Sequence, residues 1–115
     1  TANNRFSFIG AGRNHSAAGK RSFIGTGFQH SLNALFGTAL NGDGNTISSG
    51  GDYSTILNGS ENTVSGQLST IVNASGSTIP ASAHTSVILG LNDYVATSAN
   101  TVYAKNLNRL YCNQC

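Results

Sequence analysis

Short apolar clusters recur along the chain at a nearly constant spacing. The clearest pair, residues 7–10 and 22–25, reads Ser-Phe-Ile-Gly in both copies, fifteen residues apart. In each copy a small residue, Gly and two variable residues follow, and then His-Ser. Looser copies lie at residues 35–37, 56–58, 71–73, 88–90 and, in degenerate form, 102–104. A fixed period of this length indicates a stack of repeating units rather than one globular core.

A second, weaker apolar signal lies between these clusters, at residues 16–17, 31–32, 46–47, 63–64, 78–79 and 94–95. Gly and Asn, which tolerate positive φ in tight turns, separate the two signals. Each period therefore predicts strand, turn, strand, turn, with no helical period in any long stretch. We predict an all-β parallel solenoid of about seven coils over residues 1–105, followed by a C-terminal exit segment over residues 106–115.

The spacing between clusters is not uniform. The Gly or Asn that ends each cluster falls at positions 10, 25, 37, 58, 73 and 90. This numbering makes the second interval short, at 12 residues, and the third long, at 21 residues. We therefore expect two irregular coils with added loops, the larger one around residues 41–44.

The first strand of each coil carries two neighbouring apolar residues, and strand side chains alternate between faces. One residue of each pair can be buried inside its coil, while the other would form a wet apolar stripe on a monomer. A strand that is apolar on both faces is normally buried on both. We therefore predict that the second face packs against other copies of this chain. The predicted packing residues are Phe8 and Ile9, Phe23 and Ile24, Leu35 and Phe36, Ile56 and Leu57, Ile71 and Val72, and Ile88 and Leu89.

The composition agrees with a repeat protein and disfavours two binding functions. Asn, Ser, Thr and Gly supply 54 of 115 residues, and only 9% are charged, against about 25% in typical domains. The regular apolar clusters argue against disorder. A net charge of +2 is too small to indicate nucleic-acid binding, and no apolar run is long enough to insert into a membrane.

Few residues are candidates for chemistry. His15 and His30 occupy the same phase of adjacent coils and are weak candidates for metal ligands, but no nearby carboxylate completes a site, so a polar turn role is favoured. Cys112 and Cys115 could form intrachain or interchain disulfides or remain free thiols. Sequons at Asn14, Asn58 and Asn73 matter only in a glycosylating compartment. No cofactor is expected.

The repeats resemble a known family of surface proteins. Residues 7–10, 22–25, 54–58, 69–73 and 86–90 are similar to the left-handed parallel β-roll heads of trimeric autotransporter adhesins, whose coils read roughly Ser-Val-Ala-Ile-Gly. Similar repeats occur in viral and phage tail fibres and spikes. The resemblance implies a homotrimer on a virion or bacterial cell surface, outside the cell. It also implies a non-enzymatic attachment role with a host receptor or surface glycan as partner.

Two alternative functions remain open. A carbohydrate-degrading spike module would need paired carboxylates, for which Asp52 and Glu61 are the possible neighbours across coils. An ice-binding solenoid would need a flat Thr array. Thr55, Thr70 and Thr85 recur at fifteen-residue intervals, but without a paired second Thr.

Overall fold

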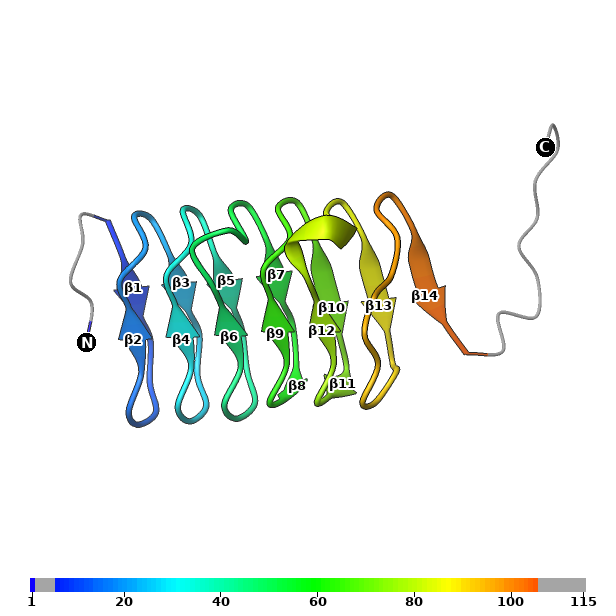
Figure 1. Ribbon diagram of the computed structural model, residues 1–115. Helices are drawn as coiled ribbons and strands as arrows, with labels where there is room; N and C mark the ends of the chain where they lie inside the picture. The colour runs from blue at the N-terminus through cyan, green and yellow to red at the C-terminus, as the bar shows by residue number, and fades with distance from the viewer. Residues whose placement is uncertain (2–5, 106–115) are drawn as a thin grey trace, which may run out of the picture.

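The computed structural model describes Thr1 and residues 6–105, which form a β-solenoid of about six turns. Successive coils stack side by side from the N-terminus to the C-terminus (Figure 1). The molecule is a rod, with principal extents of 46 × 22 × 20 Å. The described residues contain no α-helix, and their one 3₁₀ turn is η1 (Ala81–Ala83). The all-β parallel solenoid is thus confirmed, while the count of seven coils and the trimer are not.

Two parallel sheets form the broad faces of the rod. The main sheet runs in the order β1 (Phe8–Ile9), β3 (Phe23–Ile24), β5 (Thr38–Ala39), β7 (Thr55–Ile56), β10 (Thr70–Val72), β13 (Val87–Leu89), β14 (Val102–Ala104). The second sheet runs in the order β12 (Thr78–Ile79), β9 (Thr63–Val64), β6 (Thr46–Ile47), β4 (Ser31–Leu32), β2 (Ser16–Ala17). A small third sheet pairs β8 (Gly59–Ser60) with β11 (Ala74–Ser75).

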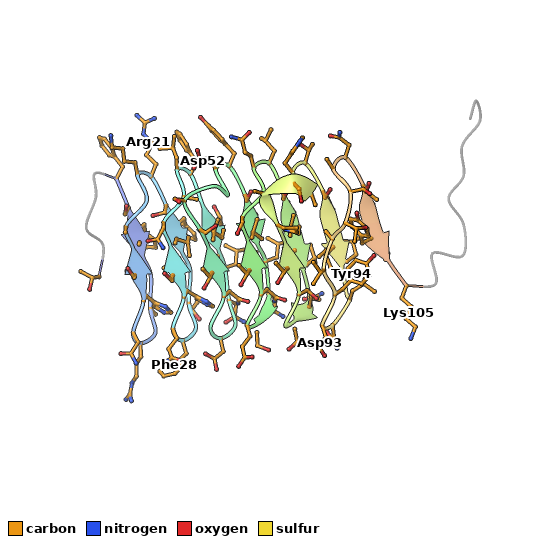
Figure 2. All side chains as sticks on the ribbon, viewed as in Figure 1. Arg21, Phe28, Asp52, Asp93, Tyr94 and Lys105 are labelled. Carbon is orange, nitrogen blue, oxygen red and sulfur yellow. The ribbon has the colours of Figure 1, made fainter. Side chains whose placement is uncertain are left out.

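Turns along two opposite rims connect the sheets. We call the rim with Arg21 and Asp52 the upper rim, and the rim with Phe28 and Asp93 the lower rim (Figure 2). At the upper rim one residue of each coil adopts the left-handed conformation, with φ between 54° and 66°. This column consists of Phe6, Arg21, Phe36, Tyr53, Leu68, Thr85 and Asn100.

The structure corrects the expected third strand. The strand that pairs with β3 is Thr38–Ala39, with Ile24 opposite Ala39, and not Leu35–Phe36. Leu35 and Phe36 lie in the upper-rim turn, where Phe36 has a φ of 56° that no strand residue adopts. Their apolar character suggested a strand, but Thr38 and Ala39 occupy the strand positions. The expected 12- and 21-residue intervals are therefore wrong, and residues 41–44 form an ordinary lower-rim turn.

The core consists of two rows of aliphatic side chains, one from each sheet, that lie between the sheets. The main sheet contributes Ile24, Ile56, Ile71 and Ile88, and the second sheet contributes Leu32, Ile47, Val64 and Ile79, all fully buried. Each such side chain stabilises the fold by about 2 kcal/mol. Every coil thus supplies one core residue from each sheet, so the stack buries what one coil could not bury alone.

Two expectations from the sequence concern the C-terminal segment and membrane insertion. The exit segment over residues 106–115, including Cys112 and Cys115, lies outside the described residues, so the disulfide prediction stays a prediction. Within the described part of the chain, no helix has the length and apolar character that crossing a membrane requires.

Candidate functional site

The outer face of the main sheet carries an apolar stripe along the rod. Its side chains alternate in direction with the buried core residues of the same strands. Phe8 is 52% exposed, Phe23 38%, Leu57 37% and Leu89 39%. We define the apolar stripe as Phe8, Phe23, Leu40, Leu57, Val72, Val87, Leu89 and Val102.

The outward side chains of the main sheet form two rows along the rod, which we call ranks. The first rank precedes the core residue of each strand and the second rank follows it, and the two ranks complement each other in size. In the first two coils the large residue comes first, and the Phe8 and Phe23 rings stack with centroids 5.0 Å apart. Gly10 and Gly25 follow them, and an added Cβ at either would lie 2.5 Å from a carbonyl oxygen of the next coil. In the next three coils the first rank is Thr and the second rank is Leu or Val. In the last two described coils the first rank is Val, and Leu89 and Ala104 form the second rank. The apolar surface is therefore continuous although the large residue changes rank.

In most of the predicted packing pairs one residue lies in the core and the other on the stripe, because successive strand side chains point to opposite faces. Ile24, Ile56, Ile71 and Ile88 are buried, and their neighbours Phe23, Leu57, Val72 and Leu89 point outward. Ile9 is only partly buried. The pair Leu35 and Phe36 belongs to neither set, because both lie at the upper rim. Sequence reasoning missed Leu40, which a strict fifteen-residue count from Gly25 would have found.

A buried polar ladder runs inside the lower rim. His15, His30, Asn45, Asn62 and Ser77 occupy one inward position in successive coils. In each case the side chain accepts a hydrogen bond from the backbone N–H of the next member, as from His30 to His15 Nδ1 at 3.3 Å and from Asn62 to Asn45 Oδ1 at 3.1 Å. The ladder therefore satisfies amide groups that the turns leave without strand partners.

The ladder fixes the chemical state of the two histidines. Nδ1 of His15 and of His30 accepts a backbone N–H, so it carries no proton. Nε2 of each ring lies 3.0–3.1 Å from a carbonyl oxygen, of Ala11 and of Thr26 respectively, and donates to it. Both ring nitrogens are thus used within the fold. This geometry favours the polar turn role over metal binding, and the described residues contain no cluster of three potential metal ligands.

Burial lowers the pKa of His30, and electrostatic coupling to His15, whose ring stacks on it at 5.1 Å, lowers it further. The hydrogen bond to the Thr26 carbonyl and the charge of Asp43 act in the opposite direction, but less strongly. The structure therefore holds His30 as a neutral imidazole.

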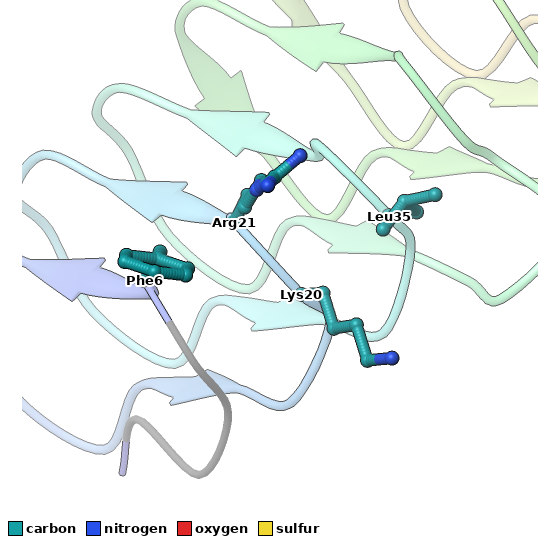
Figure 3. Close-up of a pocket in the computed structure, with 4 residues that line it drawn as sticks. All are labelled: Phe6, Lys20, Arg21 and Leu35. Atoms are coloured by element: carbon teal, nitrogen blue, oxygen red, sulfur yellow. The ribbon is translucent and has the colours of Figure 1, made fainter.

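The upper rim contains a basic and aromatic hollow of about 320 Å³, lined by Phe6, Lys20, Arg21 and Leu35 (Figure 3). The Arg21 guanidinium lies between two rings, 5.7 Å from Phe6 and 5.2 Å from Phe36. No ion pair joins Lys20 or Arg21 to a carboxylate in the described part of the chain. The hollow has the charge and aromatic surface to hold an anionic group. Asp52, the acid on the coil next to Leu35, does not neutralise it, because its carboxylate accepts the Leu35 N–H at 2.8 Å.

The structure does not bring the two candidate catalytic acids together. Asp52 lies in the upper-rim turn between β6 and β7, whereas Glu61 lies in the lower-rim turn between β8 and β9. Asp52 is engaged by a backbone amide, and Glu61 is exposed. Acid and base catalysis on one glycosidic bond needs both carboxylates at one site.

The Thr residues proposed for an ice-binding array also separate. Thr55 and Thr70 lie with Thr38 in the first rank beside the apolar stripe, but Thr85 has a φ of 57° and lies at the upper rim. A more regular hydroxyl array occurs on the outer face of the second sheet. Its first rank is Ser16, Ser31, Thr46, Thr63 and Thr78, and Ser48 and Ser65 form part of a second rank.

Comparison with protein-family models, with curated proteins and with solved structures gives no match to this chain. The functional interpretation therefore depends on the surfaces themselves. The rod presents an apolar face, a hydroxyl face, an upper rim with a basic hollow in its first coils, and a polar lower rim. The first of these is the surface least compatible with exposure to water.

Proposed function

We propose that this chain is a structural and attachment module of a homotrimeric surface fibre, without enzymatic activity. The observation that supports the proposal is the apolar stripe, which follows the main sheet from β1 to β14. Soluble monomers rarely expose a contiguous apolar surface of this kind, whereas interfaces bury it. The stripe includes two stacked phenylalanine rings and three leucine side chains that are each more than a third exposed.

The partner that fits the stripe best is another copy of the same chain. The side chains of the stripe repeat at the spacing of parallel strands, about 4.8 Å, over the length of the rod. A partner needs the same repeat to interdigitate along that whole length. Parallel copies around a three-fold axis supply it, and they leave the second sheet and the lower rim facing outward.

The family resemblance of the repeats supports the rest of the proposal. A left-handed β-roll that trimerises is a typical module of extended fibres on virions and bacterial surfaces. In this position the outward surfaces would contact a host receptor or surface glycan. The asymmetry between an apolar face and polar outer surfaces agrees with such a fibre.

The molecular mass in solution tests the proposal. Light scattering of the purified chain should give three times the protomer mass of 11.8 kDa. The double variant Leu57→Gln with Leu89→Gln removes apolar groups from the stripe without touching the core, so it should lower the mass to that of a monomer or prevent stable assembly. A monodisperse wild-type monomer would contradict the proposal.

The control for this experiment is Leu68→Gln. Leu68 is 58% exposed, but it lies in the left-handed column of the upper rim rather than on the stripe. Gln is compatible with that backbone conformation, since Gln29 adopts it at the lower rim with a φ of 54°. The control should stay trimeric, and circular dichroism should show the same β signal in all three proteins.

A second candidate function, ice binding, is favoured by the outer face of the second sheet. Its aligned ranks of Ser and Thr form an array without charged residues across β4, β6 and β9. The array could order water at the strand spacing of about 4.8 Å. Thermal hysteresis of a concentrated solution would support this function, and its absence would remove it.

A further inference from the structure

The lower rim contains a shallow groove that runs along the rod axis. Its volume is about 550 Å³, and its floor includes Gly42 and Gly59. These glycines have φ of 116° and 128°, and a Cβ at either would lie 1.9 Å from a carbonyl oxygen of the next coil. The close stacking of coils thus excludes side chains from the floor and leaves the groove open.

The walls of the groove carry hydrogen-bonding groups of both kinds. On one side Asn58 Nδ2 donates to Asn73 Oδ1 at 3.2 Å, and both amides are exposed. On the other side the Ser60 and Ser75 hydroxyls lie 2.9 Å apart on the paired strands β8 and β11. The hydrogen bond between the two amides does not use the Asn58 oxygen or the Asn73 amino group. The walls therefore offer both an acceptor and a donor.

The one charged residue that lines the groove is acidic, and the nearest cation in its column, Arg13, lies two coils away from it. Asp43 lines the groove, and no Lys or Arg is among its lining residues. Glu61 and Asp93 occupy the same rim, and Figure 2 shows Asp93 projecting from it together with Phe28. Phe28 does not line the groove, but it pairs with Asp43 on the neighbouring coil and is 37% exposed, so an aromatic side chain lies one coil beyond Asp43.

We propose that this groove binds a neutral oligosaccharide, a conclusion that deepens the proposed attachment function and rests on it. Amide and hydroxyl groups that donate and accept, a single carboxylate acceptor and an adjacent aromatic ring match the alternating hydroxyl groups and apolar faces of sugars. The axial run of the groove matches a linear chain. Sialylated, uronic and sulfated glycans are repelled by Asp43 and its acidic neighbours.

A glycan array tests the proposal directly. The chain is made in a bacterial host that leaves the sequons at Asn58 and Asn73 unmodified. The array carries neutral oligosaccharides of glucose, galactose, mannose and N-acetylhexosamines beside sialylated, uronic and sulfated ones. We expect retention on neutral glycans, and titration of the best-retained neutral oligosaccharide should shift the amide resonances of residues 58–60 and 73–75.

Two variants connect the binding to the groove. Asn58→Ala with Asn73→Gly removes both wall amides, and Gly keeps the left-handed backbone of Asn73, whose φ is 51°. This variant should weaken binding at least tenfold. Ser75→Ala removes one hydroxyl and should weaken it severalfold, which provides a second measurement if the double variant fails to fold. Asn33→Ala is the matched control, since Asn33 is exposed on the outer face of the second sheet.

Three results would overturn the groove proposal: no retention of any neutral glycan, retention of acidic glycans alone, or neutral binding that the double variant does not weaken. Retention of acidic glycans alone would favour the Lys20 and Arg21 hollow of the upper rim instead. The mass of each sample, measured by light scattering, reports on the trimer separately. A trimer without glycan binding would end the groove proposal alone, and a monomer that binds neutral glycans would end the fibre proposal alone.

Discussion

At the scale of single residues, the inward polar ladder shows how this fold satisfies the backbone of its turns. Asn45 and Asn62 and the two histidines perform the same task, since each accepts the backbone N–H of the next coil. Their second polar atom donates to a carbonyl oxygen of a nearby turn. Buried polar groups in folded proteins are normally paired in this way. Asparagine and neutral histidine thus make equivalent hydrogen bonds here, but only histidine can gain a proton.

This difference predicts acid sensitivity that originates at His30. Burial and the neighbouring His15 lower the pKa of His30 in the folded chain, while the unfolded chain keeps a value of about 6.5. Between these two pKa values the unfolded state binds more protons, so the free energy of unfolding falls as pH falls. The contribution is complete above pH 6.5 and is lost as pH approaches the folded pKa. Urea unfolding at a series of pH values between 7.5 and 5 should show this loss.

The variant His30→Asn separates this effect from other titrations. Asn at this position can accept the Asn45 N–H and donate to a carbonyl oxygen, as Asn45 and Asn62 do in their own coils. The variant should therefore fold, and its free energy of unfolding should fall less than that of the wild type over the same pH range. Asp43 and His15 face His30 in both proteins. If the two stability curves run parallel, His30 is not the sensitive group.

At the scale of the elements, each coil follows a simple count. The core residue of the main sheet and the next core residue of the second sheet are eight positions apart around the lower rim, as are Ile24 and Leu32. The return around the upper rim takes seven residues, as from Leu32 to Ala39. Two returns take nine, from Ile47 to Ile56 and from Ile79 to Ile88. Comparison with regular coils identifies the extra residues as Ser49–Gly50 and Ala81–Ser82.

The count predicts that the first insertion can be removed. Deleting Ser49 and Gly50 joins Ser48 to Gly51 and gives Ile-Ser-Gly-Asp-Tyr-Ser-Thr-Ile, which follows the pattern of residues 64–71, Val-Ser-Gly-Gln-Leu-Ser-Thr-Ile. Asp52 stays in place to accept the Leu35 N–H. We expect the variant to fold with a stability within about 1 kcal/mol of the wild type, because surface loops tolerate length changes. Circular dichroism and urea unfolding measure this.

A deletion of the same size at the lower rim is the control. Removing Asn41 and Gly42 takes away a glycine whose φ is 116° and shortens an eight-residue turn that has no variation among the described coils. This variant should lose its cooperative unfolding transition. If the two deletions lower the stability equally, the upper-rim turn is no more tolerant of a change in length than the lower-rim turn, and the prediction is wrong.

The sequence was sufficient for the solenoid because the repeat is carried by strand positions that are mostly β-branched or aromatic. It was insufficient where small residues fill those positions. Thr38 and Ala39 form a strand only because Ile24 and Ile56 lie on either side of Ala39 in the sheet, whereas Leu35 and Phe36 resembled the other clusters more closely. The polar ladder was visible only as His15 and His30, because the misplaced third strand hid the phase of Asn45 and Asn62. The groove arises from backbone stacking at Gly42 and Gly59, which no local pattern reveals.

At the scale of the whole molecule, the strand–strand contacts of the described coils are made mainly between neighbouring coils. Repeat arrays of this kind owe their stability to the sum of nearest-neighbour interfaces, and terminal coils need caps. In the last described strand, Tyr103 occupies the core position of β14 and tilts against Tyr94, with ring centroids 5.2 Å apart. A larger ring thus replaces the isoleucine that earlier coils carry at this position.

The phenol of Tyr103 also orders the final upper-rim turn. Its oxygen accepts the N–H groups of Thr97 and Ser98, at 3.1 and 2.7 Å, and its hydroxyl donates to the Ser98 carbonyl at 2.9 Å. Tyr103→Phe keeps the ring and removes all three bonds. Because coupling passes only between neighbouring coils, the effect should be local. Amide hydrogen exchange of residues 97–101 should become roughly tenfold faster, while the amides of β4 and β6 should keep their wild-type rates. Equal acceleration along the rod would show instead that the chain unfolds as one cooperative unit, and unchanged exchange at residues 97 and 98 would show that the phenol does not hold this turn.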